Sequence, residues 1–263
     1  MPKKMKYKIA EDARPQITLL LIATVITIAL WFIPFTDYLV YPIRLFVTFI
    51  HEGGHALAAV LTGGSVQSLT VSPDSSGLVK AYSSSSIATL IFSSAGYLSA
   101  TAYGVLLLAL IRWRVSPRVV LFGSGVFIAL LTIVFGFLAP VFHIFSGDIS
   151  FYGMAFTVFS GALLTAGLLG AARYASLKWA NFAVGFLAVQ CLLNAVFDLK
   201  NLFIISTTTN AHNDAMNMAE VTGLPSVVWI LIWIGISILM ISIGLRVYAI
   251  NQKGKQYDLP FED

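Results

Sequence analysis

His51, Glu52 and His55 form the pattern His-Glu-x-x-His within an otherwise apolar stretch, residues 44–64. On a helix, residues i and i+4 project from the same face about one turn apart. Two imidazoles at this spacing can bind one Zn²⁺ ion, each at about 2.0–2.1 Å. Glu52 is then placed to hold and deprotonate a water molecule. The pattern therefore predicts one zinc ion bound by His51 and His55, with Glu52 as the general base.

The pattern is specific in this chain. With four histidines and four glutamates among 263 residues, chance would produce it about 0.001 times. Ionisable groups near the bilayer centre cost on the order of 2.5–3.5 kcal/mol each, so they persist where they have partners. The alternative interpretation is a polar contact between helices that holds no metal.

A catalytic zinc site usually has three protein ligands and one open position. Asp198 is the acid that lies well inside a hydrophobic segment outside the motif, and a zinc ion would offset the cost of placing it there. We therefore predict Asp198 as the third ligand. Its alternative roles are pairing with Lys200 or reaching the membrane surface. Asn194, one turn earlier, is a candidate hydrogen-bond donor to a developing oxyanion, to the substrate or to Asp198. The alternative role of Asn194 is helix packing.

Other candidate ligands lie in connectors between apolar segments. Asp214 is the alternative third ligand, because the sequence His212-Asn213-Asp214 could bring a carboxylate to the site from a loop. His143, Asp148 and His212 are weaker candidates. A carboxylate in a loop is normally just solvated, so the sequence favours Asp198 over Asp214.

The elements that must position these residues are membrane segments. The chain is 58% hydrophobic and 11% charged, whereas a soluble domain is about half apolar and a quarter charged. We predict an all-α polytopic membrane protein with about seven hydrophobic segments, each near the length that spans a bilayer. The segments are 16–35, 43–62, 87–111, 119–141, 149–172, 179–205 and 225–248.

The connector after the motif differs from the others. Apolar and polar residues alternate before a turn signal at residues 73–77, and a second short strand-like run follows. This pattern predicts a β-hairpin at about 65–82, with a solvated loop as the alternative. We expect a polar basic segment at 1–15, one membrane-embedded domain at 16–250 and a polar tail at 251–263.

Basic residues cluster beside the hydrophobic segments, where membrane topology explains them. They do not indicate binding to nucleic acid. The N-terminal and C-terminal clusters can both be cytoplasmic only if the first three segments make an even number of crossings, so charge counting leaves the N-terminal orientation open. Cys191, the single cysteine, lies in an apolar run and is expected to be a buried apolar residue.

The segment around the motif, FIHEGGHALAAVLTGG, resembles the active-site helix of the site-2 protease family of intramembrane zinc metalloproteases. The hairpin-like connector is similar to that family's membrane-associated hairpin. The run 94–98, Ser-Ala-Gly-Tyr-Leu, is a weaker match to its small-residue motif. The family's third zinc ligand is a later aspartate in a membrane segment, a context that Asp198 matches without the usual proline and glycine. No PDZ-like insertion is present, so a compact bacterial-type member is the closest match.

This resemblance implies hydrolysis of peptide bonds in transmembrane protein substrates, with one zinc ion as the cofactor. The expected location is a bacterial inner membrane, with the lipid bilayer around the protein. The alternatives are a catalytically silent relative that acts as a membrane scaffold, and a metal transporter. The substrate and the oligomeric state are not evident from the sequence.

Overall fold

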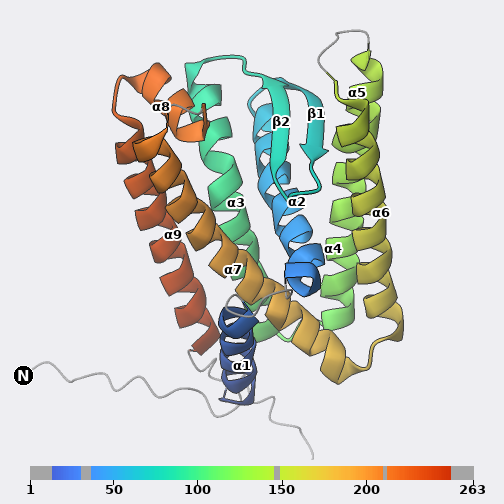
Figure 1. Cartoon of the computed structure of the whole chain (residues 1–263). Coiled ribbons are helices and arrows are strands. Elements are labelled where there is room, and N and C mark those ends of the chain that lie inside the picture. The colour runs from blue at the N-terminus through green and yellow to red at the C-terminus, as the bar shows by residue number, and fades with distance from the viewer. Residues whose placement is uncertain (1–13, 31–36, 145–148, 210–211, 250–263) are drawn as a thin grey trace, which may run out of the picture.

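The computed structural model describes residues 14–30, 37–144, 149–209 and 212–249, which form a helical bundle with one β-hairpin (Figure 1). The elements in chain order are α1 (Arg14–Leu30), α2 (Asp37–Leu61), β1 (Ser65–Val71), β2 (Gly77–Tyr82), α3 (Ser86–Arg112), α4 (Pro117–Leu131), the π-helical segment η2 (Thr132–Leu138), α5 (Ala139–Phe142), α6 (Phe151–Tyr174), α7 (Leu177–Thr208), α8 (Asp214–Thr222) and α9 (Ser226–Ala249).

Five helices in the described part of the chain are long and apolar enough to cross a membrane. They are Ser86–Arg112, Pro117–Phe142, Phe151–Tyr174, Leu177–Thr208 and Ser226–Tyr248. The predicted multi-helix membrane fold is thus confirmed, but the count of seven segments is not. The predicted segments 16–35 and 43–62 correspond to α1 and α2, which are not among the five. The charged and imidazole side chains of the motif and Arg44 lower the hydropathy of α2.

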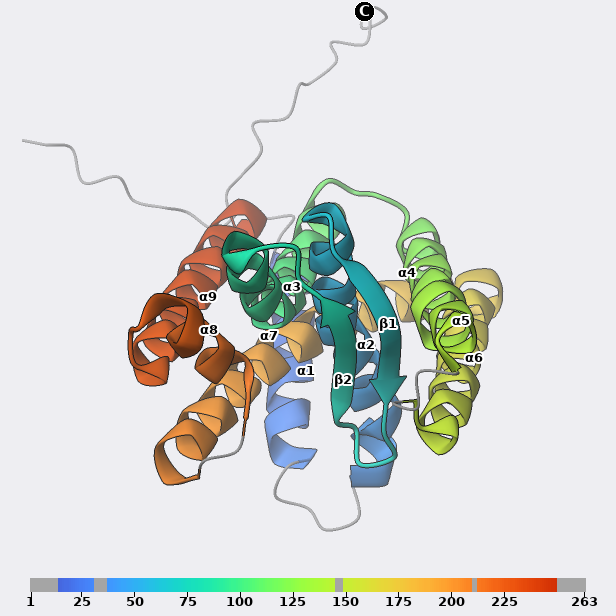
Figure 2. The same ribbon diagram turned by 90° about the horizontal axis from the view of Figure 1, so that it is seen from above.

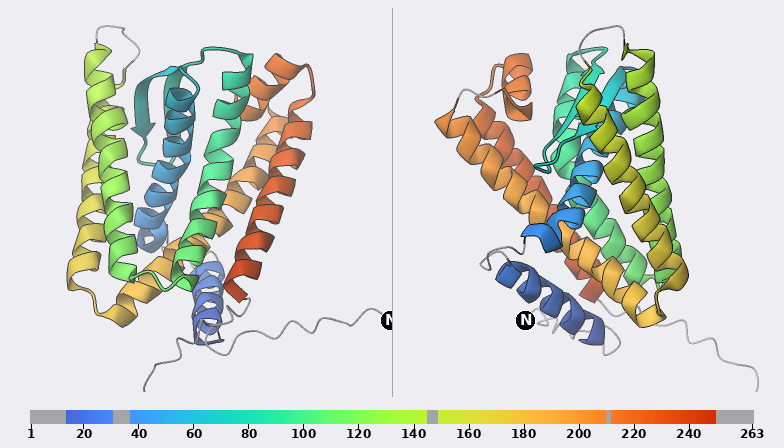
Figure 3. Two further views of the ribbon diagram at one scale, coloured as in Figure 1. Left: turned by 180° about the vertical axis from the view of Figure 1, so that it is seen from behind. Right: turned by 45° about the vertical axis from the view of Figure 1, so that its right-hand side comes forward.

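The helices pack around α2 and α3. Seen from above, the hairpin lies over α2, between α3 and the pair formed by α4 and α6 (Figure 2). On the other side of α3, α7 runs obliquely across the bundle and leads to the short α8 and then to α9. The helix α1 lies at the end of the bundle opposite α8 (Figure 3). The upper end in Figure 1 therefore carries α8 and the open end of the hairpin.

The predicted hairpin is confirmed. Strands β1 and β2 pair antiparallel, with Ser65 opposite Tyr82 and Val71 opposite Gly77, and a bulge interrupts the ladder between Val66 and Ser68. The turn between the strands contains Ser75 in the left-handed region, with φ of 68°. The hairpin therefore runs from the upper end of the bundle back along α2 toward its N-terminus (Figure 1).

Side chains from two helices hold the hairpin. The Thr48 hydroxyl of α2 donates to the Ser75 carbonyl oxygen at 2.8 Å. On the other side, the Val71 amide donates to the Thr157 hydroxyl oxygen of α6 at 2.8 Å. Because both bonds join residues distant in sequence, the hairpin is a fixed part of the bundle and not a free connector.

Two groups of buried apolar side chains form the core. The larger one joins α2, α3, α4, α7 and the hairpin. The smaller one joins α3, α7, α8 and α9, and we call it the α8 cluster. Its members are Tyr97, Leu199, Leu202, Ala215, Met218, Ile230 and Trp233. The α8 cluster fixes the short helix against three longer ones.

Some predicted regions lie outside the described residues. These are the tail 251–263, residue Asp148, and the N-terminal segment 1–15 apart from the first two positions of α1. The division of the chain into these segments and one domain at 16–250 stays a prediction.

Candidate metal centre

The motif histidines lie one turn apart on α2. Their Nε2 atoms are 3.2 Å from each other. The Nδ1 atom of His55 is 2.7 Å from the main-chain carbonyl oxygen of Phe92 on α3. A carbonyl oxygen can only accept a hydrogen bond, so Nδ1 carries the proton and the neutral ring keeps a lone pair on Nε2. The helix α3 therefore orients His55 with a metal-binding nitrogen facing His51.

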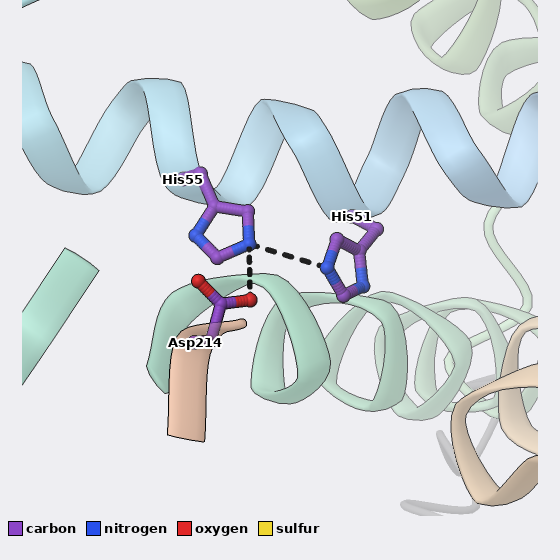
Figure 4. A group of neighbouring side chains, drawn as sticks. All are labelled: His51, His55 and Asp214. Carbon is purple, nitrogen blue, oxygen red and sulfur yellow. Dashed lines mark hydrogen bonds and ion pairs between the residues drawn. The ribbon is translucent and has the colours of Figure 1, made fainter. Parts of the chain in front are cut away.

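The third member of the group is Asp214, at the first turn of α8. Its Oδ2 atom lies 3.4 Å from the Nε2 atom of His55, as Figure 4 shows. One donor atom from each of His51, His55 and Asp214 lies within 4.8 Å of the other two. Among the described residues this is the one such group of histidine, cysteine and acidic side chains found.

The short helix that carries Asp214 is well defined at both ends. Asn213 caps its N-terminus, since the side-chain oxygen accepts from the amides of Ala215 at 3.0 Å and Met216 at 3.1 Å. Gly223 ends the helix in the left-handed conformation, with φ of 73°. These caps stabilise a short helix that would be marginal alone. They explain how a carboxylate in a connector acquires a fixed position.

The arrangement fits a zinc ion. Two donors that are each about 2.0–2.1 Å from an ion, in a tetrahedral arrangement, lie about 3.3–3.4 Å apart. The observed separations of 3.2 Å between the imidazoles and 3.4 Å between His55 and Asp214 agree with this value. Two neutral imidazoles and one carboxylate are also a ligand set that zinc commonly has in catalytic sites.

A glycine of α3 keeps the space in front of the imidazoles open. A Cβ atom at Gly96 would overlap the Nε2 atoms of both His51 and His55, and would lie 2.7 Å from Cδ2 of His51. Any larger residue would therefore displace both rings. The small residue at this position belongs to the run 94–98 that resembles a family motif.

Glu52 is held beside this group by the hairpin. The side chain is buried, with 6% of its surface exposed. Its carboxylate accepts a hydrogen bond from the backbone amide of Val79 in β2. The start of β2 is also close, since a Cβ atom at Gly77 would lie 2.5 Å from Cγ of Glu52. The hairpin thus fixes the direction of the carboxylate next to the first histidine.

Asp198, the predicted third ligand, is not brought into the donor group; Asp214, the predicted alternative, is. Asp198 lies on α7, half-buried, and interacts electrostatically with Glu52 and Tyr97. The amide of Asn194 donates to the main-chain carbonyl oxygen of Gln190 at 2.9 Å. The Gln190 amide in turn donates to the Thr27 hydroxyl oxygen of α1 at 2.5 Å. Asn194 therefore bonds within α7, to the residue that makes the polar contact with α1.

The other predicted histidines lie elsewhere. The Nδ1 atom of His143 is 2.8 Å from the carbonyl oxygen of Ala139 one turn earlier. His212 is exposed, with its Nδ1 atom 3.9 Å from a carboxylate oxygen of Glu220. Neither belongs to the donor group.

Sequence reasoning missed the roles of three features around the histidines: Gly96, the Phe92 carbonyl and the fixed position of α8. A signal for α8 was present in the sequence. Asn213 is a strong N-cap residue, and Gly223 followed by Pro225 marks a helix end. Together these residues predict a helix at 214–222, which would have made Asp214 the first-turn residue of an ordered element.

The fold and the donor group define a class of molecule, a multi-helix membrane protein with a candidate metal site inside its bundle. The Peptidase M50B-like family profile matches residues 20–244, most of the chain. The chain therefore belongs to this family, which is the site-2 protease family. Membership implies a metal-dependent membrane peptidase. Comparisons with curated proteins and with solved structures gave no significant match.

Proposed function

We propose that this protein is an intramembrane zinc metalloprotease that hydrolyses peptide bonds of transmembrane proteins. His51, His55 and Asp214 are the proposed zinc ligands, and Glu52 is the proposed general base. The observation that carries the proposal is the spacing of the three donors beside a buried carboxylate: His55 is 3.2 Å from His51 and 3.4 Å from Asp214, and all three donor atoms lie within 4.8 Å of one another.

A bound zinc ion would supply Lewis-acid chemistry, polarising the scissile carbonyl and making a water molecule acidic near neutral pH. Glu52 accepts the proton of the attacking water and later transfers it to the nitrogen of the leaving amine. The hydrogen bond from the Val79 amide and the contact with Gly77 hold the carboxylate for these transfers. The Phe92 carbonyl keeps His55 in the required tautomer.

The hairpin is the proposed substrate platform. A transmembrane helix satisfies its amides internally, so it must be locally unwound before hydrolysis. Within the described part of the chain, strand β2 pairs with β1 alone, and it passes Glu52 at Gly77 and Val79. Its other edge can pair with an extended substrate segment by strand addition. This would align the substrate backbone next to the general base.

The position of Glu52 supports hydrolysis over the two alternatives. A silent scaffold has no use for a buried carboxylate fixed by a hydrogen bond beside metal donors. A transporter needs further polar sites along a path through the bundle. Among the described residues, one cluster of side chains that could bind a metal was found, and it is the donor group.

The test is Glu52→Gln in purified, zinc-loaded protein in lipid nanodiscs, with a library of transmembrane peptides as substrates. The variant keeps the shape of the side chain but cannot take up a proton. We expect one zinc ion per chain and a loss of cleavage of at least about 10²-fold, within the usual contribution of a general base. The matched control is Glu220→Gln, at an exposed glutamate of α8. Full cleavage by Glu52→Gln would contradict the proposed role, and wild-type protein that binds zinc without cleaving any peptide would contradict the proposed function.

A further inference from the structure

Tyr97 of α3 lies directly beside the donor group. Its ring contacts the His51 ring edge to face, with centroids 4.7 Å apart and an angle of 88°. On its other side the ring stacks on Trp233 of α9 at 5.2 Å and 19°. The indole nitrogen of Trp233 donates to the Ser94 hydroxyl oxygen at 3.0 Å. The Tyr97 ring is thus fixed between a candidate ligand and an anchored tryptophan.

The Tyr97 residue is 8% exposed, and no hydrogen bond joins its hydroxyl to a described residue. The hydroxyl oxygen is not among the fully enclosed polar atoms that lack a partner, so it is open to a further acceptor. This hydroxyl instead lies within electrostatic range of the carboxylates of Asp214, Asp198 and Glu52. It is therefore a donor near the donor group that has no acceptor among the described residues.

Tyr97 and Glu52 reach the histidines from different elements. Glu52 is turned toward the hairpin, where it meets Gly77. Tyr97 is part of the α8 cluster, which α3, α7, α8 and α9 form. A substrate carbonyl at the donor group would therefore lie near the general base, which α2 carries, and near the phenol, which α3 carries. In acyl transfer, a hydrogen-bond donor at the position of the phenol can stabilise the negative charge that develops on the carbonyl oxygen.

We propose that Tyr97 is a further catalytic residue, whose hydroxyl donates a hydrogen bond to the scissile carbonyl oxygen and to the oxyanion that forms from it. This inference rests on the proposed peptidase function. Tyr97 keeps its proton throughout: the proton of the attacking water passes to Glu52 and then to the leaving amine. The contribution of Tyr97 is a hydrogen bond that is stronger in the transition state than in the bound substrate.

The experiment compares Tyr97→Phe with wild type in zinc-loaded protein. The substitution keeps the ring between His51 and Trp233 and removes the hydroxyl alone. We expect unchanged zinc content, an unchanged KM and a kcat lowered about 10²-fold, the usual loss for one oxyanion donor. A phosphinic peptide, which mimics the tetrahedral intermediate, should bind about 10²-fold more weakly to Tyr97→Phe. A hydrogen bond that stabilises the transition state also stabilises the complex with a transition-state analogue. This binding measurement requires no turnover.

The matched control is Tyr103→Phe, two turns further along α3. That hydroxyl donates to the Ser124 hydroxyl oxygen at 2.7 Å, away from the site, and we expect kcat and inhibitor binding to stay at wild-type values. Wild-type kcat in Tyr97→Phe would overturn the proposal, as would loss of zinc, which would show that the hydroxyl holds the metal site. An equal loss in Tyr103→Phe would also overturn it. Wild-type protein that neither cleaves nor binds the inhibitor would overturn the proposed function itself.

The distribution of charge carries a second, independent inference about where the site opens. Basic side chains gather at the end of the bundle opposite α8, where α3, α6 and α9 end and α4 and α7 begin (Figures 1 and 3). They are Arg112, Arg114, Arg118, Arg173, Lys178 and Arg246. At the other end, the described connectors contain one basic residue, Lys80 in the hairpin. The donor group and α8 belong to that poorly basic end.

Short loops rich in lysine and arginine stay on the cytoplasmic side of a membrane. We infer that the end with α8 and the donor group faces the extracytoplasmic side, so that substrates are cut in the outer part of their membrane segment. This orientation places α1 and the C-terminal end of α9 on the same, cytoplasmic side, because both lie at the basic end of the bundle (Figure 1).

Cysteine labelling tests this orientation in intact cells with a membrane-impermeant maleimide. Cys191 is fully buried, and the parent protein should stay unlabelled. The probes are Leu224→Cys, which lies between α8 and α9, and Tyr174→Cys at the end of α6; both parent side chains are exposed. We expect Leu224→Cys to be labelled in intact cells and Tyr174→Cys only after permeabilisation. The reverse pattern, or equal labelling of both, would contradict the inference.

Discussion

Two aspartates in neighbouring helices show how this protein builds its candidate site. Asp198 lies in α7, a 32-residue apolar helix, whereas Asp214 begins α8, a helix of 9 residues outside the five candidate membrane spans. The carboxylate of Asp214 is 3.4 Å from His55, and Asp198 is not in the donor group. A short capped helix packed on the bundle therefore brings a candidate ligand to the histidines, and the long apolar helix does not.

Gly96→Ala is expected to have the largest effect on zinc affinity, and it tests whether Asp214 acts together with both histidines. The new methyl group would overlap both imidazoles and move them away from the carboxylate of Asp214. We expect zinc affinity to fall at least about 10²-fold, because even indirect perturbation of metal ligands costs 10–100-fold. Isothermal titration with zinc measures this loss. Gly170→Ala is the control, since a Cβ there would meet nothing within 4 Å; wild-type affinity in Gly96→Ala would contradict the described geometry.

The next effect concerns the packing that holds α8. Met218 is 2% exposed in the α8 cluster, and replacing a buried methionine by alanine costs about 2–5 kcal/mol. We expect Met218→Ala to lower the stability by this order and to weaken zinc binding. Chemical unfolding with and without zinc measures both. Met216→Ala, on the same helix but outside the cluster, should have a clearly smaller effect; equal effects would show that packing does not position Asp214.

The smallest effect is expected from the N-cap of α8. Asn213→Ala removes two hydrogen bonds to the first turn, and the loss of such a cap costs about 0.5–2 kcal/mol. Ser150→Ala removes the cap of α6, where the Ser150 oxygen accepts from the Gly153 amide at 3.1 Å. Thermal unfolding should show similar losses for both variants. Only Asn213→Ala should also weaken zinc binding. If both variants bound zinc with equal affinity, the N-cap of α8 would not contribute to the position of Asp214.

Much of the molecule could be predicted from its sequence because the relevant signals are local. The spacing of His51 and His55 predicted that both lie on one helical face, and the structure places both imidazoles there. Alternation around residues 73–77 predicted the hairpin, which is confirmed. Long apolar runs predicted the membrane helices, although α1 and α2 are not among the five candidate spans of the described residues and the predicted count of seven is not confirmed.

The third member of the donor group could not be predicted in the same way, because its position depends on contacts between distant segments. Asp198 drew attention because an acid is expensive in an apolar segment. The cost of burying an acid does not determine how far that residue lies from the histidines. Asp214 approaches His55 because the α8 cluster packs residues 97, 199, 215, 218 and 233 together. Such contacts follow from the complete fold.

Zinc titration of Asp214→Ala and Asp198→Ala, side by side with wild type, tests the central claim most directly. We expect wild type and Asp198→Ala to bind one zinc ion per chain with similar affinity, and Asp214→Ala to bind at least about 10²-fold more weakly. Undiminished binding by Asp214→Ala together with loss of zinc in Asp198→Ala would contradict the assignment of the third ligand and return it to α7.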